Sequence, residues 1–251
     1  FRHRRTQGSI LKKMMSCSLK GLLRCPICGG VLDRDSAHAG LPDHGSFSAY
    51  RCSGCECSWP VVGSIPRFTT DTHYSSSFGH QWNRFEKVQI DSHSGLTHSS
   101  QRLFNESGWN REGLDGQLVL EVGSGAGRFT QVLLDETMAQ VVSVDASNAV
   151  DANHRNNGHH GERLLLAQAT IYKLPFSDNI FDKVLCLGVL QHTPDVNASV
   201  ASLVGKAAPG GEIVVDFYQR RGWWTFVQAK YLLRPITTRL SPARLATLIE
   251  C

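Results

Sequence analysis

A short glycine-rich segment constrains the fold more than any other stretch of the chain. An apolar run ends at Glu121, and the pattern Glu-x-Gly-x-Gly-x-Gly follows as far as Gly127. Glycine has no Cβ, so the backbone can turn sharply there and lie close to a ligand. A parallel strand that enters a helix through such a turn presents the helix N-terminus to a nucleotide-like ligand. A dinucleotide fingerprint would need Gly where Arg128 stands, and no P-loop Lys-Ser/Thr is present.

Apolar runs alternate with helical patterns from residue 118 onward. The expected strands are 118–122, 141–144, 163–167, 181–187 and 212–218, and the expected helices are 128–134, 147–157 and 195–207, with a turn at 209–211. Strands that are almost wholly Val, Ile and Leu, placed between helices, predict a parallel sheet covered on both faces. Right-handed crossovers then give a doubly wound α/β fold.

Five motifs resemble, in order, those of the class I S-adenosylmethionine (SAM)-dependent methyltransferases. They are the glycine turn, Asp145 after the second strand, and the segments 168–176, 188–195 and 209–212. The resemblance implies a Rossmann-like doubly wound fold with SAM as the cofactor. The family sheet normally has two further strands, and we expect this chain to lack them, as a truncated chain would.

Ligands of such sheets bind at the carboxyl ends of the strands, so we expect SAM there. The glycines would hold its aminoacyl and ribose part, and Glu121 would favour its ammonium group, directly or through water. Asp145 can accept hydrogen bonds from both ribose hydroxyls, although a helix N-cap is the alternative for this residue. Thr170 stands where the family usually has an Asp that contacts adenine. The expected cofactor-binding residues are Glu121, Gly123, Ser124, Gly125, Gly127, Asp145, Ala146, Ser147, Thr170, Ile171, Leu187 and Gly188.

His192 is the candidate general base. Methyl transfer is an in-line displacement that depends on holding nucleophile, methyl and sulfur collinear. A base is needed only if the acceptor must lose a proton, and imidazole titrates near neutrality. The alternative is that His192 bonds backbone and shapes its turn. We expect Asp195 to cap a helix rather than to act as a catalytic acid.

Two Cys-x-x-Cys pairs predict a structural zinc site. Cys25 and Cys28 are separated from Cys52 and Cys55 by 23 residues, a pattern that can supply four thiolates to one Zn²⁺. Residues 23–68 resemble the small zinc-ribbon modules of some methyltransferases, with a long loop at 33–49. The alternative is two unrelated thiol pairs, and Cys57 is a possible alternate ligand.

Charge is distributed unevenly. The formal net charge is +4, but residues 1–32 hold seven Lys/Arg and no acid, so the rest of the chain carries −3. That excludes a strongly basic nucleic-acid surface on the main body. The basic start fits a disordered extension, a transit peptide or an RNA-contacting arm. No apolar run reaches the roughly 18 residues of a membrane span, and no signal-peptide core is present, so we expect a reducing, cytoplasmic setting.

The sequence divides into five parts. We expect a basic extension at 1–22, a zinc module at 23–68, a linker with lid helices at 69–112, the SAM-binding domain at 113–218 and a helical cap at 219–251. Phe78, Trp82 and Phe85 share one helix face and would either cover the SAM pocket or pack on the sheet. Trp223 and Trp224 would either line an acceptor pocket or pack in the core.

Three functions fit these patterns. The first is a SAM-dependent methyltransferase acting on a small-molecule acceptor. The second is an RNA methyltransferase whose zinc module and basic arm grip nucleic acid. The third is a non-catalytic partner protein with the SAM-binding fold. The sequence gives neither the acceptor nor the oligomeric state.

Overall fold

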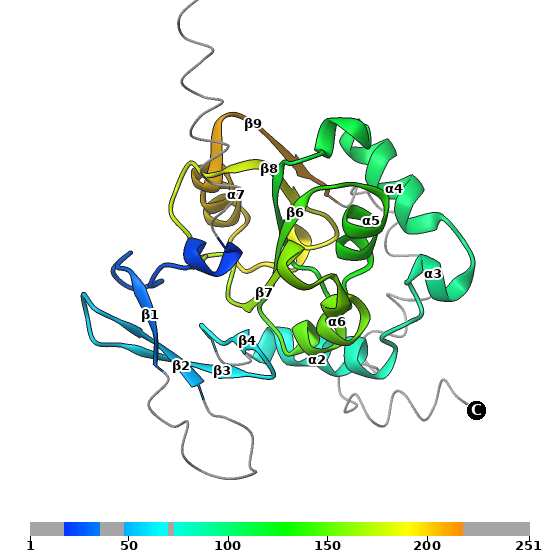
Figure 1. The fold of residues 1–251 in the computed structure, drawn as a ribbon. Helices are drawn as coiled ribbons and strands as arrows, with labels where there is room; N and C mark the ends of the chain where they lie inside the picture. Colours follow the sequence, from blue (N-terminus) through cyan, green and yellow to red (C-terminus); the bar gives the residue numbers. More distant parts are fainter. Residues whose placement is uncertain (1–17, 36–47, 70–72, 218–251) are drawn as a thin grey trace, which may run out of the picture.

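The computed structural model describes residues 18–35, 48–69 and 73–217 (Figure 1). Its strands are β1 Leu32–Asp35, β2 Ser48–Cys52, β3 Ser58–Val62, β4 Ile65–Pro66, β5 Leu118–Val122, β6 Gln140–Asp145, β7 Leu164–Gln168, β8 Phe181–Cys186 and β9 Ala207–Val215. Its α-helices are α2 His73–Arg84, α3 Asp91–Ser94, α4 His98–Ser107, α5 Arg128–Glu136, α6 Ala149–Asn157 and α7 Val196–Lys206. Its 3₁₀ helices are η1 Leu19–Leu22, η2 Glu112–Leu114, η3 Gly158–Arg163 and η4 Leu190–His192.

Several predicted segments lie outside the described residues. They are most of the basic extension, the greater part of the loop at 33–49 and the cap that contains Trp223 and Trp224. Within the described residues, no helix has the length and apolar character needed to cross a bilayer.

Five parallel strands form the central sheet in the order β7-β6-β5-β8-β9. This confirms the predicted α/β fold. The chain runs from β5 through β6 to β7 and then returns to β8 on the other side of β5. The strand order therefore reverses beside β5, and a ligand crevice is expected at the carboxyl ends of the strands there. All five residues of β5 are buried, as a strand covered on both faces requires.

The two faces of this sheet are covered differently. On one face, Leu103 of α4 and Phe129 and Leu133 of α5 form an apolar cluster with side chains of β5, β6 and β8. On the other face, Leu203 of α7 shares a cluster with residues of the N-terminal module, by which we mean the described residues 18–35 and 48–68. These module residues are Leu19, Leu23, Tyr50, Val61 and Phe68. The module is therefore part of the main core.

The N-terminal module is a four-stranded antiparallel sheet in the order β1-β2-β3-β4. Two isolated bridges join it to the rest of the chain. Arg67 pairs in parallel with Gln168, and Leu23 pairs in antiparallel fashion with Phe176. The edge strand β7 is thus partly covered by the module, as Figure 1 shows for β4 and β7.

The last strand differs from its prediction. A turn was expected at 209–211 before a strand at 212–218, whereas β9 begins at Ala207. Ala207 pairs with Phe181 and Glu212 pairs with Lys183, so the intervening residues bulge out of the ladder. Gly210 has φ +82°. Glycine in this conformation is found both in turns and in β-bulges, so the sequence pattern predicted a turn where the strand bulges.

The predicted aromatic face of α2 is only partly correct. Phe78 and Trp82 lie on α2 and line a cavity. Phe85 follows the last residue of α2 and is 38% exposed. Phe85 therefore does not extend the aromatic helix face that Phe78 and Trp82 form.

Candidate functional site

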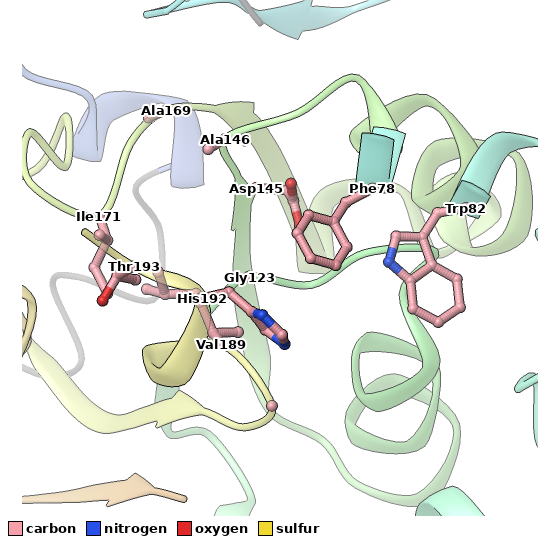
Figure 2. A pocket seen from close by; sticks show the side chains of 12 residues that line it. Phe78, Trp82, Gly123, Asp145, Ala146, Ala169, Ile171, Val189, His192 and Thr193 are labelled. Carbon is pink, nitrogen blue, oxygen red and sulfur yellow. The ribbon is translucent and has the colours of Figure 1, made fainter. Parts of the chain in front are cut away.

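Two adjoining cavities lie at the carboxyl ends of β5, β6 and β8 (Figure 2). The first has a volume of about 100 Å³ and the second about 270 Å³. Both are lined by Phe78, Trp82, Gly123, Gly188 and His192. The first is also lined by Val122, Asp145, Ala146, Ala169, Ile171, Val189 and Thr193. The second is also lined by Gln81, Gln89, Arg102, Ser124, Gly125, Ala126, Arg128, Phe129 and Leu187.

The glycine turn owes its shape to backbone conformations that other residues avoid. Gly123 has φ +81° and Gly127 has φ +86°. A Cβ at Gly123 would overlap the side chain of Val189, and one at Gly127 would overlap Asn153. Gly127 is also the N-cap residue of α5 and lines neither cavity. Gly127 is therefore needed for the turn into α5, and its predicted contact with the cofactor has no support from the cavities.

The Asp145 carboxylate connects two turns. Its Oδ2 accepts a hydrogen bond from the backbone N–H of Gly125 at 2.8 Å. Its Oδ1 accepts from the backbone N–H of Ser147 at 2.8 Å and from the Ser147 hydroxyl at 2.7 Å. The N-cap residue of α6 is Asn148, so Asp145 does not cap that helix. Asp145 faces the first cavity (Figure 2), and Ser147 is fully buried beneath it.

Glu121 lies under the glycine turn and lines neither cavity. It is 2% exposed, and its Oε2 accepts hydrogen bonds from Thr130 and, at 3.0 Å, from Ser143. Burial raises the pKa of this carboxyl to about 7, against the opposing effect of those two hydroxyls. The structure thus gives Glu121 a buried network, and its contact with a ligand ammonium stays a prediction.

Only some of the residues predicted to lie near adenine line a cavity. Ala146 and Ile171 line the first cavity as predicted, and Ala169 joins them. Thr170 lines neither cavity, because its two neighbours face inward. Leu187 lines the second cavity.

His192 lies where the two cavities meet. It is the last residue of η4, and its ring centroid is 5.1 Å from that of Phe78. Figure 2 shows Phe78 and Trp82 reaching in from α2, opposite His192 and Val189. Asp195 is the N-cap residue of α7 and accepts from the N–H of Ala198 at 3.0 Å. This confirms the capping role predicted for Asp195.

Two arginines that the sequence analysis did not single out line the second cavity. Arg102 pairs with Glu106 and with Asp216. The Arg128 guanidinium lies 4.3 Å from the centroid of the Phe129 ring, and burial together with the Arg102 charge lowers its pKa. The Ser124 hydroxyl beside them is buried without a hydrogen-bond partner. Cationic groups and an unused hydroxyl make this cavity suited to an anionic group.

Arg128 stands directly after the glycine turn, and that position was the available signal for it. Arg102 comes from α4, and nothing in its local sequence indicates where α4 packs.

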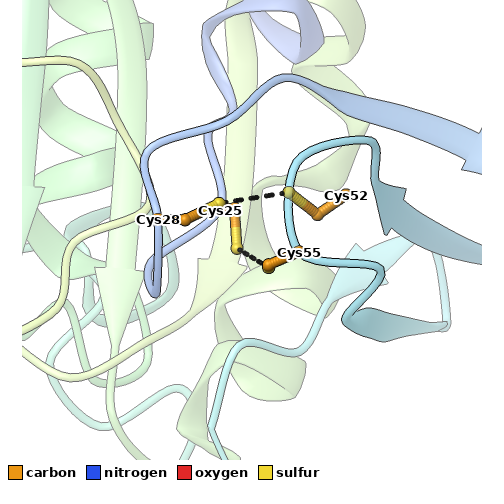
Figure 3. Close-up of side chains that lie close together, drawn as sticks. All are labelled: Cys25, Cys28, Cys52 and Cys55. Atoms are coloured by element: carbon orange, nitrogen blue, oxygen red, sulfur yellow. Dashed lines mark hydrogen bonds between the residues drawn. The ribbon is translucent and has the colours of Figure 1, made fainter.

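The four predicted zinc ligands lie together (Figure 3). Their sulfur atoms all lie within 4.8 Å of one another, with Cys25 3.6 Å from Cys55 and Cys28 3.4 Å from Cys52. Thiolates around a tetrahedral zinc, with bonds near 2.3 Å, stand about 3.8 Å apart. The donor set and its spacing therefore fit Zn²⁺. Cys57 does not belong to this cluster.

Comparison with known proteins identifies the region that contains the cavities. Residues 120–215 match the family model described as a methyltransferase domain. The chain is therefore similar to methyltransferase domains over this region. The match runs from within β5 to the end of β9, and most residues that line the two cavities lie inside it.

Individual relatives carry different names. A ubiquinone biosynthesis O-methyltransferase of Alkalilimnicola ehrlichii is 32% identical over 131 residues, which are 49% of this chain and 51% of that protein. A tRNA U34 carboxymethyltransferase of Campylobacter curvus is 27% identical over 104 residues, which are 41% of this chain and 35% of that protein. The chain thus spans about half the length of the first relative and less of the second.

Solved methyltransferase structures are similar to part of this chain at low identity. Phosphoethanolamine N-methyltransferase 1 of Haemonchus contortus, in complex with phosphoethanolamine and S-adenosylhomocysteine (SAH), is 22% identical with a TM-score of 0.44. The match covers 55% of this chain and 31% of that one.

The raised pKa of Glu121 predicts how stability depends on pH. Between about pH 4.5 and 7 the folded chain retains a proton that the unfolded chain releases, so this residue makes stability fall as pH rises. Each unit of pKa difference corresponds to about 1.4 kcal/mol. We expect Glu121→Gln to remove this part of the pH dependence. Urea unfolding of both proteins at pH 5 and pH 8 measures it.

The exposed Glu162 provides a control. Glu162→Gln should keep the wild-type difference between the two pH values. If Glu121→Gln and wild type lose the same stability between pH 5 and pH 8, the buried carboxyl does not titrate as described.

Proposed function

We propose that this chain is a SAM-dependent methyltransferase that methylates a small-molecule acceptor by in-line displacement. One observation carries the proposal. In a region similar to methyltransferase domains, the Asp145 carboxylate is bonded to the glycine turn at the point where the strand order reverses. An acid and a glycine turn in that arrangement suit the sugar and the aminoacyl end of one ligand.

The residues that line the two cavities support assigning one end of SAM to each. Asp145, Ala146, Ala169 and Ile171 would hold the adenosine part in the first cavity, which is mainly apolar apart from the acid. Arg128, Ser124 and the turn backbone would hold the methionine part in the second cavity. When bound, SAM supplies a methyl group on a positively charged sulfur. The residues shared by both cavities would surround that methyl group and exclude water from it.

The side chains where the two cavities meet favour a small acceptor. Phe78, Trp82 and Val189 offer apolar and aromatic surface to the acceptor, and His192 can accept a proton from it. The Alkalilimnicola ehrlichii relative is named as an O-methyltransferase of ubiquinone biosynthesis, which supports a small-molecule acceptor. The net charge of −3 outside residues 1–32 also fits a neutral acceptor better than a polyanion.

RNA is the second candidate acceptor, because the Campylobacter curvus relative is named for a tRNA. The zinc module and the basic N-terminal residues would then contact phosphates. Phosphate contacts release counterions, so RNA binding would weaken steeply with added salt. A non-catalytic partner role is the third candidate, and it predicts no SAM binding.

We also propose that Cys25, Cys28, Cys52 and Cys55 hold one structural Zn²⁺. The sulfur spacing supports this, and four thiolates leave no open coordination position for catalysis. Thiolates must stay reduced to hold zinc, so a cytoplasmic setting belongs to the same proposal.

Replacing Asp145 tests cofactor binding. We expect Asp145→Ala to weaken SAH binding about tenfold to a hundredfold, because hydrogen bonds to a charged group are lost. Isothermal titration calorimetry with SAH measures this effect. Asp33→Asn, at an exposed position of β1, should bind as wild type. Wild-type protein that gives no saturable heat with SAH would favour the non-catalytic candidate.

Replacing His192 tests the base. Labelled SAM is first incubated with small-metabolite and RNA pools to find the acceptor. On that acceptor, His192→Ala should lower turnover about a hundredfold or more, as expected for a lost general base, and should leave SAH affinity unchanged. His80→Ala, at an exposed position of α2, is the control. Full turnover by His192→Ala would show that no base acts there, and label in RNA would exclude the small-acceptor proposal.

Metal analysis tests the zinc site. Purified protein should contain close to one zinc per chain, and Cys52→Ser should lose it because a structural site needs all four ligands. Cys57→Ser should keep the metal, since Cys57 lies outside the cluster. Equal zinc contents in wild type and Cys52→Ser would rule out the assigned ligand set.

A further inference from the structure

We propose that Arg67 of the N-terminal module is a positioning residue for the adenosine side of the cofactor site. Arg67 lines neither cavity. It acts through Gln168 on the backbone that borders the first cavity. The inference rests on the proposed SAM binding and adds a determinant of affinity that lies in another part of the chain.

The module is attached to the carboxyl end of β7 through its backbone. The N–H of Phe68 donates to the carbonyl oxygen of Gln168 at 2.7 Å, next to the Arg67–Gln168 bridge. Gln168 is the last residue of β7, and Ala169 after it lines the first cavity. The attachment is thus one residue from the cavity wall.

The Arg67 side chain extends this attachment to the next loop. One guanidinium nitrogen donates to Gln168 Oε1 at 3.2 Å, and the other pairs with Asp151 at 2.5 Å. Gln168 Nε2 in turn donates to the carbonyl oxygen of Ala146 at 3.1 Å. Ala146 lines the first cavity directly after Asp145. Two side chains, Arg67 and Gln168, therefore connect the module to the backbone carbonyl of Ala146 at the cavity.

Burial makes this chain of bonds firm. The Arg67 side chain is only 11% exposed, and Gln168 is 5% exposed. Hydrogen bonds shielded from water hold their geometry better than exposed ones. The N–H of Ala169 also donates to the carbonyl oxygen of Asp145 at 3.0 Å. Ala169 is thus bonded to Asp145, and Ala146 is connected to Arg67 through Gln168.

A second attachment joins the module to a segment that follows the cavity wall in sequence. The N–H of Arg24 donates to the carbonyl oxygen of Pro175 at 2.8 Å, and Leu23 bridges to Phe176. The segment 174–176 follows Ile171, which lines the first cavity. Arg24 precedes Cys25, so the cysteine cluster adjoins this attachment. The module therefore contacts two segments that adjoin the cavity, and only the contact at Arg67 acts through a side chain on a residue bonded to the cavity wall.

The test measures binding of SAH and of 5′-methylthioadenosine, which lacks the amino-acid end. We expect Arg67→Ala to weaken both by the same factor, about threefold to tenfold, the range for losing a hydrogen bond. Arg67→Lys can keep the Asp151 pair but lacks the fork that also reaches Gln168. We expect it to show the weakened binding with little change in thermal stability. Arg34→Ala, at an exposed position in the same module, should bind both ligands as wild type.

Two results would overturn the inference. If wild type binds SAH and both Arg67 variants bind it equally well, Arg67 has no positioning role. If Arg67→Ala and Arg67→Lys weaken SAH but not 5′-methylthioadenosine, the effect lies at the wrong end of the ligand. A wild-type chain that binds neither ligand would instead remove the proposed function on which the inference rests.

Discussion

The structure of the site depends on the bonds that the Asp145 carboxylate makes with two turns. One turn follows β5 and contains Gly125, and the other follows β6 and contains Ser147. Because a single rigid group accepts from both, the spacing between the turns is set before any ligand arrives. An already ordered site avoids the entropy of ordering loops on binding. The acid is also held facing the first cavity by the same bonds.

A buried polar network supports the turn from below. Asn153 of α6 donates to Thr130 of α5 at 2.9 Å and to Ser143 of β6 at 3.0 Å, and both hydroxyls bond to Glu121 of β5. Asn157 donates to the carbonyl oxygen of Gly127 at 2.9 Å. Two strands and two helices thus meet in one network, which rigidifies the base of the turn. The acid of the glycine motif has a structural use whatever its effect on a ligand.

Local patterns predicted most of the fold. Apolar runs placed β5 and β6 correctly, because a strand buried on both faces leaves an unmistakable stretch of Val and Leu. The two Cys-x-x-Cys pairs predicted the cysteine cluster, because each pair is local in sequence and brings two thiols together. The bulge around Gly210 was predicted as a turn, since both use a positive φ. Arg102 and the pairing of Arg67 with Gln168 could not be predicted, because those contacts join segments far apart in sequence and depend on how whole elements pack.

The shared core means that the border expected near residue 68 does not separate two folding units. Phe68 and Leu23 belong to the same apolar cluster as Leu203. A polypeptide cut at that border would expose to water the part of this sheet face that α7 does not cover, and would leave the edge of β7 open to pairing with other molecules. The part of the chain after residue 68 is therefore expected to be aggregation-prone when expressed alone. The N-terminal module covers that part of the sheet as a further layer of helix would.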